Sequence, residues 1–113
     1  MEHEMRLDQD PFQMIKNGQK TIELRLYDEK RRKIAVGDTI VFTETKTSER
    51  MRVIVTDLHV FPTFSELYRA LPLASCGYTE AELETATPDD MLAYYSLTRQ
   101  QQHGVVGIGI AKL

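Results

Sequence analysis

Ten residues, Gly18-Gln-Lys-Thr-Ile-Glu-Leu-Arg-Leu-Tyr27, carry the clearest structural pattern in this chain of 113 residues. Apolar and polar side chains alternate strictly from Thr21 to Tyr27, which predicts a strand with one buried face. That face holds Ile22, Leu24 and Leu26, and the opposite, polar face is expected to point outward. Before the strand, Asn17-Gly18 offers a left-handed residue that can end a short helix.

The flanking sequence predicts four more strands and several short helices. Further strands are expected over residues 5–7, 39–43, 51–60 and 104–113. Asp10 followed by Pro11 predicts the start of the helix that ends at Gly18. Threonines at positions 63, 79 and 87, each followed by acidic residues, predict three helices between residues 63 and 95.

Strands at both ends with helices between them predict the α+β class. We expect a small, mixed, mostly antiparallel β-barrel with short helices around a cleft, because closure removes exposed strand edges. Gly107 and Gly109 share one face of the last strand, which predicts a bend, a bulge or something packed close to the backbone. No repeat or linker divides the chain, so a single domain over residues 1–113 is expected.

Composition excludes several classes of protein. A net charge of −3 argues against a non-specific nucleic-acid binder. The one cysteine, Cys76, cannot form an internal disulfide and favours a reducing compartment. No window is apolar enough for a membrane span, and the acidic start is unlike a secretory signal, so a cytoplasmic location is expected.

Charge is distributed unevenly along the chain. Residues 16–33 contain seven basic and three acidic residues, whereas residues 61–95 contain six acidic residues and one basic residue. The basic region could steer an anion, although two ordinary solvated surfaces would give the same pattern.

The strongest candidate site is the corner that holds Lys20, Glu23 and Arg25. Arg25 could grip a phosphate or a base edge, Lys20 could act as a point charge or as a base, and Glu23 could hold both cations or take a proton. The alternative is a solvated strand face whose ion pair contributes at most about 1 kcal/mol.

Other candidate groups are few. Tyr94 and Tyr95 could stack on a ligand, with one facing inward and the other free, and His103 lies where a loop before the last strand could present it. Cys76 has no neighbouring histidine to activate its thiol. The three histidines are too far apart in sequence to suggest a metal site, and we expect no cofactor.

The pattern Gly18-x-Lys20-x-x-Glu23-x-Arg25 resembles the signature of ASCH domains, small relatives of the PUA RNA-binding fold. Gly37-Asp38 before a hydrophobic strand, the helical insertion and the closing Gly-Val-Val-x-Ile-x-Ile strand agree with it. The resemblance implies a β-barrel whose cleft is lined by the motif residues and which handles RNA or nucleosides. One similar group deacylates acetylated cytidine with a lysine, a threonine and a glutamate, and another includes a ribonuclease.

Two functional hypotheses follow from these residues. In the first, the cleft binds RNA or a nucleotide-like small molecule through Lys20 and Arg25, with a tyrosine stacking on the base. In the second, the chain is a small hydrolase of a modified nucleoside or of RNA, with Lys20 as base, Glu23 orienting it, and Tyr94, Tyr95 or His103 assisting. Here Glu23 occupies the threonine position of the deacylases, and a carboxylate does not ordinarily accept an acyl group. A protein-interaction module that uses the acidic helices is a third possibility.

Overall fold

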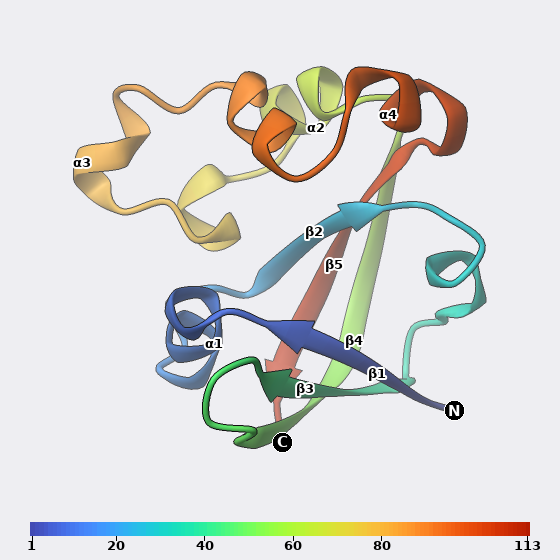
Figure 1. Cartoon of the computed structure of the whole chain (residues 1–113), viewed down its shortest axis with the longest axis vertical. Coiled ribbons are helices and arrows are strands. Elements are labelled where there is room, and N and C mark those ends of the chain that lie inside the picture. The colour runs from blue at the N-terminus through green and yellow to red at the C-terminus, as the bar shows by residue number, and fades with distance from the viewer.

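Five strands form one curled sheet in the computed structural model, which describes residues 1–113 (Figure 1). The strands are β1 (Glu2–Leu7), β2 (Ile22–Leu26), β3 (Thr39–Glu44), β4 (Arg50–Phe61) and β5 (Val105–Lys112), in the spatial order β1-β3-β4-β5-β2. β1 pairs parallel with β3, and the other neighbouring pairs are antiparallel. The predicted α+β class and the mixed, mostly antiparallel sheet are confirmed. The curl forms a half-barrel in which the edge strands β1 and β2 do not pair.

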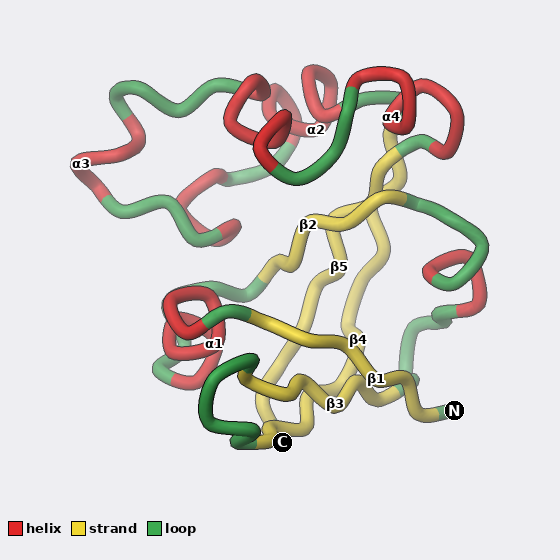
Figure 2. Tube along the Cα trace, in the orientation of Figure 1, coloured by secondary structure: helices red, strands yellow, loops and turns green.

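Short helices cover one end of this half-barrel (Figure 2). Between β4 and β5 the chain forms α2 (Phe64–Ala70), η2 (Leu73–Cys76), α3 (Glu80–Leu83), η3 (Pro88–Ala93) and α4 (Leu97–His103), where η denotes a 3₁₀ helix. The remaining two are α1 (Gln9–Lys16) and η1 (Arg31–Lys33). None of the helices is long and apolar enough to cross a membrane.

The helix starts are mostly as predicted. Thr63, Thr79 and Thr87 each accept a hydrogen bond from a backbone N–H of the first turn, and the last two form complete capping boxes. The predicted start of α1 is wrong by two residues, because Asp8 occupies the N-cap and Asp10 lies in the first turn. The segment after Thr87 forms a 3₁₀ helix that ends at Ala93, before Tyr94 and Tyr95.

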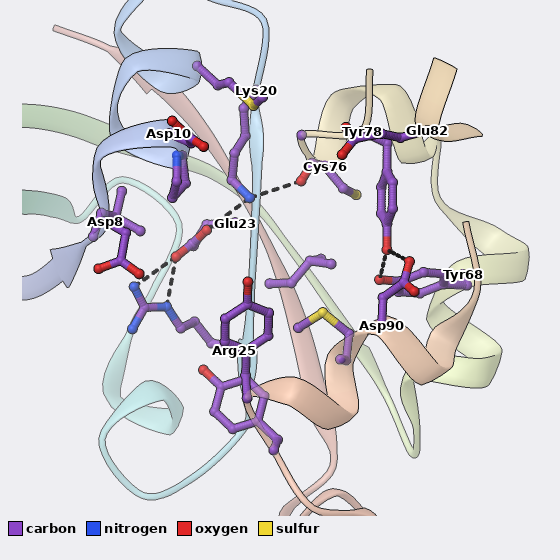
Figure 3. Close-up of a pocket in the computed structure, with 18 of the residues that line it drawn as sticks. Asp8, Asp10, Lys20, Glu23, Arg25, Tyr68, Cys76, Tyr78, Glu82 and Asp90 are labelled. Atoms are coloured by element: carbon purple, nitrogen blue, oxygen red, sulfur yellow. Dashed lines mark hydrogen bonds and ion pairs between the residues drawn. The ribbon is translucent and has the colours of Figure 1, made fainter. Parts of the chain in front are cut away.

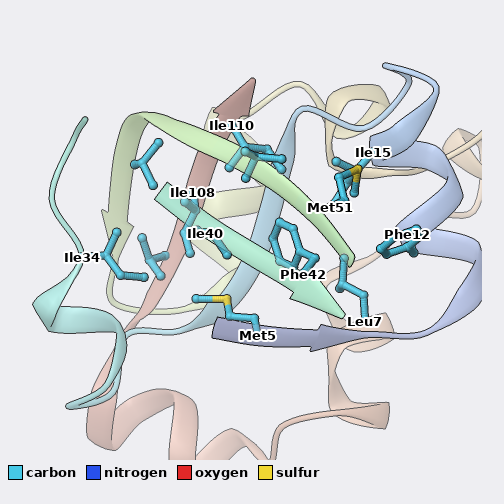
Figure 4. Packing of buried hydrophobic residues seen from close by; sticks show 13 residues of the cluster. Met5, Leu7, Phe12, Ile15, Ile34, Ile40, Phe42, Met51, Ile108 and Ile110 are labelled. Atoms are coloured by element: carbon cyan, nitrogen blue, oxygen red, sulfur yellow. The ribbon is translucent and has the colours of Figure 1, made fainter. Parts of the chain in front are cut away.

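Two hydrophobic clusters lie on opposite faces of the sheet. The larger cluster fills the concave side and includes Val106 and Ile108 of β5 (Figure 4). The second lies under the helical insertion and includes Ile22, Leu24 and Leu26. Glu23 and Arg25 pair in register with Ile108 and Val106, so their side chains share the concave face. The expectation that this polar face of β2 points outward is therefore wrong.

The two glycines of β5 allow close packing there, as predicted. A Cβ at position 107 would lie 2.7 Å from Cδ1 of Leu71, which covers the strand. Gly109 lies opposite a bulge between Val55 and Asp57 in β4, where a Cβ would lie 2.9 Å from Oγ1 of Thr56.

Candidate functional site

A pocket of about 660 Å³ opens between β2, the start of α1 and the helical insertion, and 19 residues line it (Figure 3). Lys20, Glu23 and Arg25 lie on the β2 side, and Tyr78, Glu82 and Asp90 lie across from them. Five lining residues are acidic and two are basic. The structure therefore brings the three predicted charges to one hollow, but the hollow as a whole is acidic.

Glu23 forms ion pairs with Lys20 and Arg25, and these three residues make up the floor of the pocket. Its Oε1 lies 3.1 Å from Nζ of Lys20, and its Oε2 lies 2.8 Å from both Nε and Nη2 of Arg25. The side chains of Lys20, Glu23 and Arg25 are only 9%, 6% and 13% exposed. This ion-pair triad is thus a buried structure, and the alternative of a solvated strand face is ruled out.

Local backbone contacts position Lys20. Gly18 has a left-handed φ of +85°, and the N–H of Gln19 donates to Oδ1 of Asn17, which forms the turn out of α1. The backbone N–H of Lys20 donates to the carbonyl of Met14, and that of Thr21 donates to the carbonyl of Ser75. The turn is therefore attached both to α1 and to the helical insertion.

The Lys20 ammonium also closes the end of η2. Nζ donates to the carbonyl of Cys76 at 2.9 Å, which satisfies an acceptor that a helix C-terminus would otherwise leave free. Gly77 then turns the chain away with φ +106°, and a Cβ there would lie 3.2 Å from Cδ of Lys20. These contacts fix the position of the Lys20 side chain relative to residues 76 and 77 of the insertion.

Burial and charge act in opposite directions on Glu23. Burial by itself would raise the pKa of Glu23, but the charges of Lys20 and Arg25 and the hydrogen bonds from them outweigh it, so the pKa is lowered. Glu23 is consequently ionised at neutral pH. Burial raises the pKa of the Cys76 thiol to about 11, although the charge of Lys20 opposes the rise, so Cys76 is no thiolate nucleophile.

A hydrogen-bonded chain forms the facing wall. The hydroxyls of Tyr68 and Tyr78 are 2.6 Å apart, and the Tyr78 hydroxyl donates to Oδ2 of Asp90 at 2.7 Å (Figure 3). Oδ2 of Asp90 also accepts from the backbone N–H of Thr87. Asp90 is therefore oriented by two donors, while no protein group donates to its Oδ1.

One of the two adjacent tyrosines faces inward and the other is exposed, as predicted, although both follow the 3₁₀ helix that ends at Ala93. Tyr95 stacks on Phe64 with ring centroids 6.1 Å apart, and it packs against the second cluster. Tyr94 is 71% exposed. Both line the pocket, so Tyr94 offers a free aromatic face there.

Comparison with known proteins agrees with this architecture. The family model described as ASCH domain matches residues 5–113. The chain belongs to the ASCH domain family. The resemblance inferred from residues 18–25 is thereby confirmed.

Two solved structures are similar to this ASCH domain over their full length. The hypothetical protein PH0355 is 32% identical, with complete coverage of both chains and a TM-score of 0.83. Protein PF0455 from Pyrococcus furiosus is 34% identical, with 100% of this chain and 98% of that chain covered and a TM-score of 0.73. The ZmASCH S128A mutant protein from Zymomonas mobilis shares the fold, with a TM-score of 0.61. It is 12% identical, and the match covers 96% of this chain and 67% of that chain. No curated protein matches the chain.

Some predicted groups of this ASCH domain lie outside the pocket. His103 ends α4 and does not line the pocket, and its carbonyl accepts a hydrogen bond from Arg32. The hydroxyl of Thr21, which follows Lys20 in the sequence, supplies no group to the pocket lining. No group of three or more His, Cys, Asp or Glu side chains is placed to hold a metal ion.

The unused hydrogen-bonding groups show what the pocket can contact. Lys20 carries three N–H donors, of which two are directed to Cys76 and Glu23, so one remains. Arg25 uses Nε and Nη2 on Glu23 and on the carbonyl of Arg6, which leaves Nη1 free. Tyr95 has no side-chain hydrogen bond within the protein, so its hydroxyl is available as well.

Proposed function

We propose that this ASCH domain binds RNA or a nucleotide-like small molecule, with one base held in the pocket. The observation that carries the proposal is the buried triad, which presents fixed N–H donors in a pocket that is also lined by an exposed tyrosine, Tyr94. Lys20 and Arg25 would contact acceptors on the edge of the base, and Tyr94 would stack on its face.

Binding measurements on two matched lysine variants test this proposal. Nucleosides, nucleotides and short single-stranded RNA are titrated into the intact protein by calorimetry. Lys20→Met removes the floor ammonium and keeps a side chain of similar length. Lys16→Met is the control, because Lys16 is exposed, pairs with Glu49 and lies outside this pocket. We expect Lys20→Met to weaken binding at least 10-fold, as for a hydrogen bond from a charged group, and Lys16→Met to leave it unchanged. No binding of any compound, or equal binding by Lys20→Met, contradicts the proposal.

A hydrolase is the second candidate function. It is favoured by the 3.1 Å contact between Lys20 and Glu23 in the pocket floor, where the pair could orient an attacking water. The pocket offers little else as a nucleophile, since the Cys76 thiol has a raised pKa and the hydroxyl of Thr85 donates to the carbonyl of Glu82. Incubation with acetylated cytidine and with a mixed RNA pool tests this function. Turnover that is lost in Lys20→Ala supports it, and no turnover by the parent protein refutes it.

A further inference from the structure

The chemistry of the pocket mouth differs from that of its floor. Four lining carboxylates belong to solvent-exposed residues, and we call Asp8, Asp10, Glu82 and Asp90 the acidic rim. In Figure 3 the first two lie beside the triad and the last two lie across the pocket from it. A ligand that reaches Lys20 therefore passes carboxylates on both sides.

The positive charge of the triad is too small to neutralise the acidic rim. The charges of Lys20 and Arg25 are opposed within the triad by Glu23, at 3.1 and 2.8 Å, which leaves one net positive charge against four rim carboxylates. A phosphate monoester carries about two negative charges near neutral pH. At the pocket mouth it would meet repulsion that the triad does not offset.

The rim also supplies hydrogen-bond acceptors. Oδ1 of Asp90 has no protein donor, because Tyr78 and Thr87 both donate to Oδ2. Glu82 accepts from the N–H of Thr79 with Oε1, so its Oε2 is likewise free. Hydrogen bonds from Thr79 hold the pKa of Glu82 below its ordinary value, which keeps this acceptor ionised. The pocket is thus lined by residues with free acceptors, Asp90 and Glu82, and by residues with free donors, Lys20 and Arg25.

From this arrangement we infer that the pocket selects an uncharged heterocycle bearing an exocyclic amine and keeps phosphate groups outside the acidic rim. The ring acceptors point to Lys20 and Arg25, the amine donates to Asp90 or Glu82, and Tyr94 stacks on the ring. This inference rests on the proposed function and specifies the chemical class of its ligand more closely. In an RNA, one base would enter the pocket while its backbone stays in solvent.

Two pairs of nucleosides test the amine, and phosphorylation tests the rim. Cytidine is compared with uridine, and adenosine with inosine, because each pair exchanges an exocyclic amine for a carbonyl oxygen. We expect at least one amine-bearing nucleoside to bind roughly 10-fold more tightly than its partner, as for a hydrogen bond to a carboxylate. Its 5′-monophosphate should bind several-fold more weakly than the nucleoside, and this penalty should shrink as salt is added.

Variants of the rim identify the residues responsible. Asp90→Asn and Glu82→Gln keep an oxygen for their structural hydrogen bonds, and they should reduce both the amine preference and the phosphate penalty. Asp89→Asn, next to Asp90 but outside the pocket lining, is the matched control and should change neither.

The outcomes separate this inference from the proposed function. Equal or tighter binding of both carbonyl nucleosides, or tighter binding of the monophosphate, overturns the inference. If Lys20→Met still weakens that binding at least 10-fold, the proposed function stands without the inference. Absence of binding by every nucleoside, nucleotide and RNA overturns both.

Discussion

Replacing Glu23 with Gln tests whether the triad holds the fold together. The substitution keeps the size of the side chain but leaves two cations facing each other, with only the carbonyls of Cys76 and Arg6 as further acceptors. All three side chains are less than 15% exposed, so solvent does little to screen the loss. Breaking a buried ion pair by removing one partner costs about 3–5 kcal/mol of unfolding free energy. At this chain length that lowers Tm by about 10–20 °C.

Urea denaturation of the parent and of Glu23→Gln at neutral pH measures this loss directly. The matched control is Glu49→Gln, because Glu49 lies 2.6 Å from Lys16 but the two side chains are 42% and 48% exposed. That exposed pair should contribute less than about 1 kcal/mol. A loss for Glu23→Gln as small as that for Glu49→Gln would refute the argument that the triad is desolvated.

The pH dependence of the stability difference tests the same prediction. The folded-state pKa of Glu23 lies below its ordinary 4.5, so its contribution to stability is complete above pH 4.5 and is lost as pH falls through the folded-state value. The difference in unfolding free energy between parent and Glu23→Gln should therefore be constant near neutral pH and shrink below pH 4.5. A difference that grows in acid would contradict the ion-pair origin.

Three further predictions concern the surroundings of the triad. Gly107→Ala should lower the unfolding free energy measured in urea by roughly 1–3 kcal/mol through overpacking, because its Cβ would lie 2.7 Å from Leu71. The double variant Gly107→Ala, Leu71→Ala should recover part of that loss. Cys76 should react slowly with iodoacetamide at pH 8 in the folded protein, because burial raises the pKa of its thiol to about 11. The reaction should be fast in urea. Fast reaction of the folded protein would show that the thiol is accessible. Tyr94→Leu should weaken nucleoside binding by about 1–3 kcal/mol with unchanged Tm, and unaltered affinity in calorimetry would exclude stacking on this ring.

Sequence reasoning succeeded where the information was local. The alternation of residues 21–27 predicted β2, and the threonines before acidic residues predicted three helix starts, because strand period and capping depend on neighbours in the chain. It failed for α4, whose sequence Leu-Thr-Arg-Gln-Gln-Gln-His has almost no apolar stripe. That helix exposes most of its residues and buries mainly Gln100, so its packing could not be read from hydrophobic spacing.

The burial of Glu23 could not be predicted from its own strand. Pairing with β5 places the polar face of β2 on the concave side of the sheet, where Glu23 lies against Lys20 and Arg25. That pairing joins residues that are 79 to 87 positions apart in the sequence. The acidic rim is equally non-local, since Asp8 and Asp10 come from the start of α1 and Glu82 and Asp90 from the insertion.

Burying three charges is a poor way to gain stability alone, because apolar side chains of similar size often stabilise a fold as well or better. A network with only a structural role would be expected to use its donors within the protein. Lys20 and Arg25 line the pocket and instead keep N–H groups without protein partners, while their remaining N–H groups contact Glu23, Cys76 and Arg6. Donors fixed in this way lose little conformational freedom when a ligand binds, which is the condition for selective binding at a small site. The same contacts that hold the triad in the fold therefore also prepare it for a ligand.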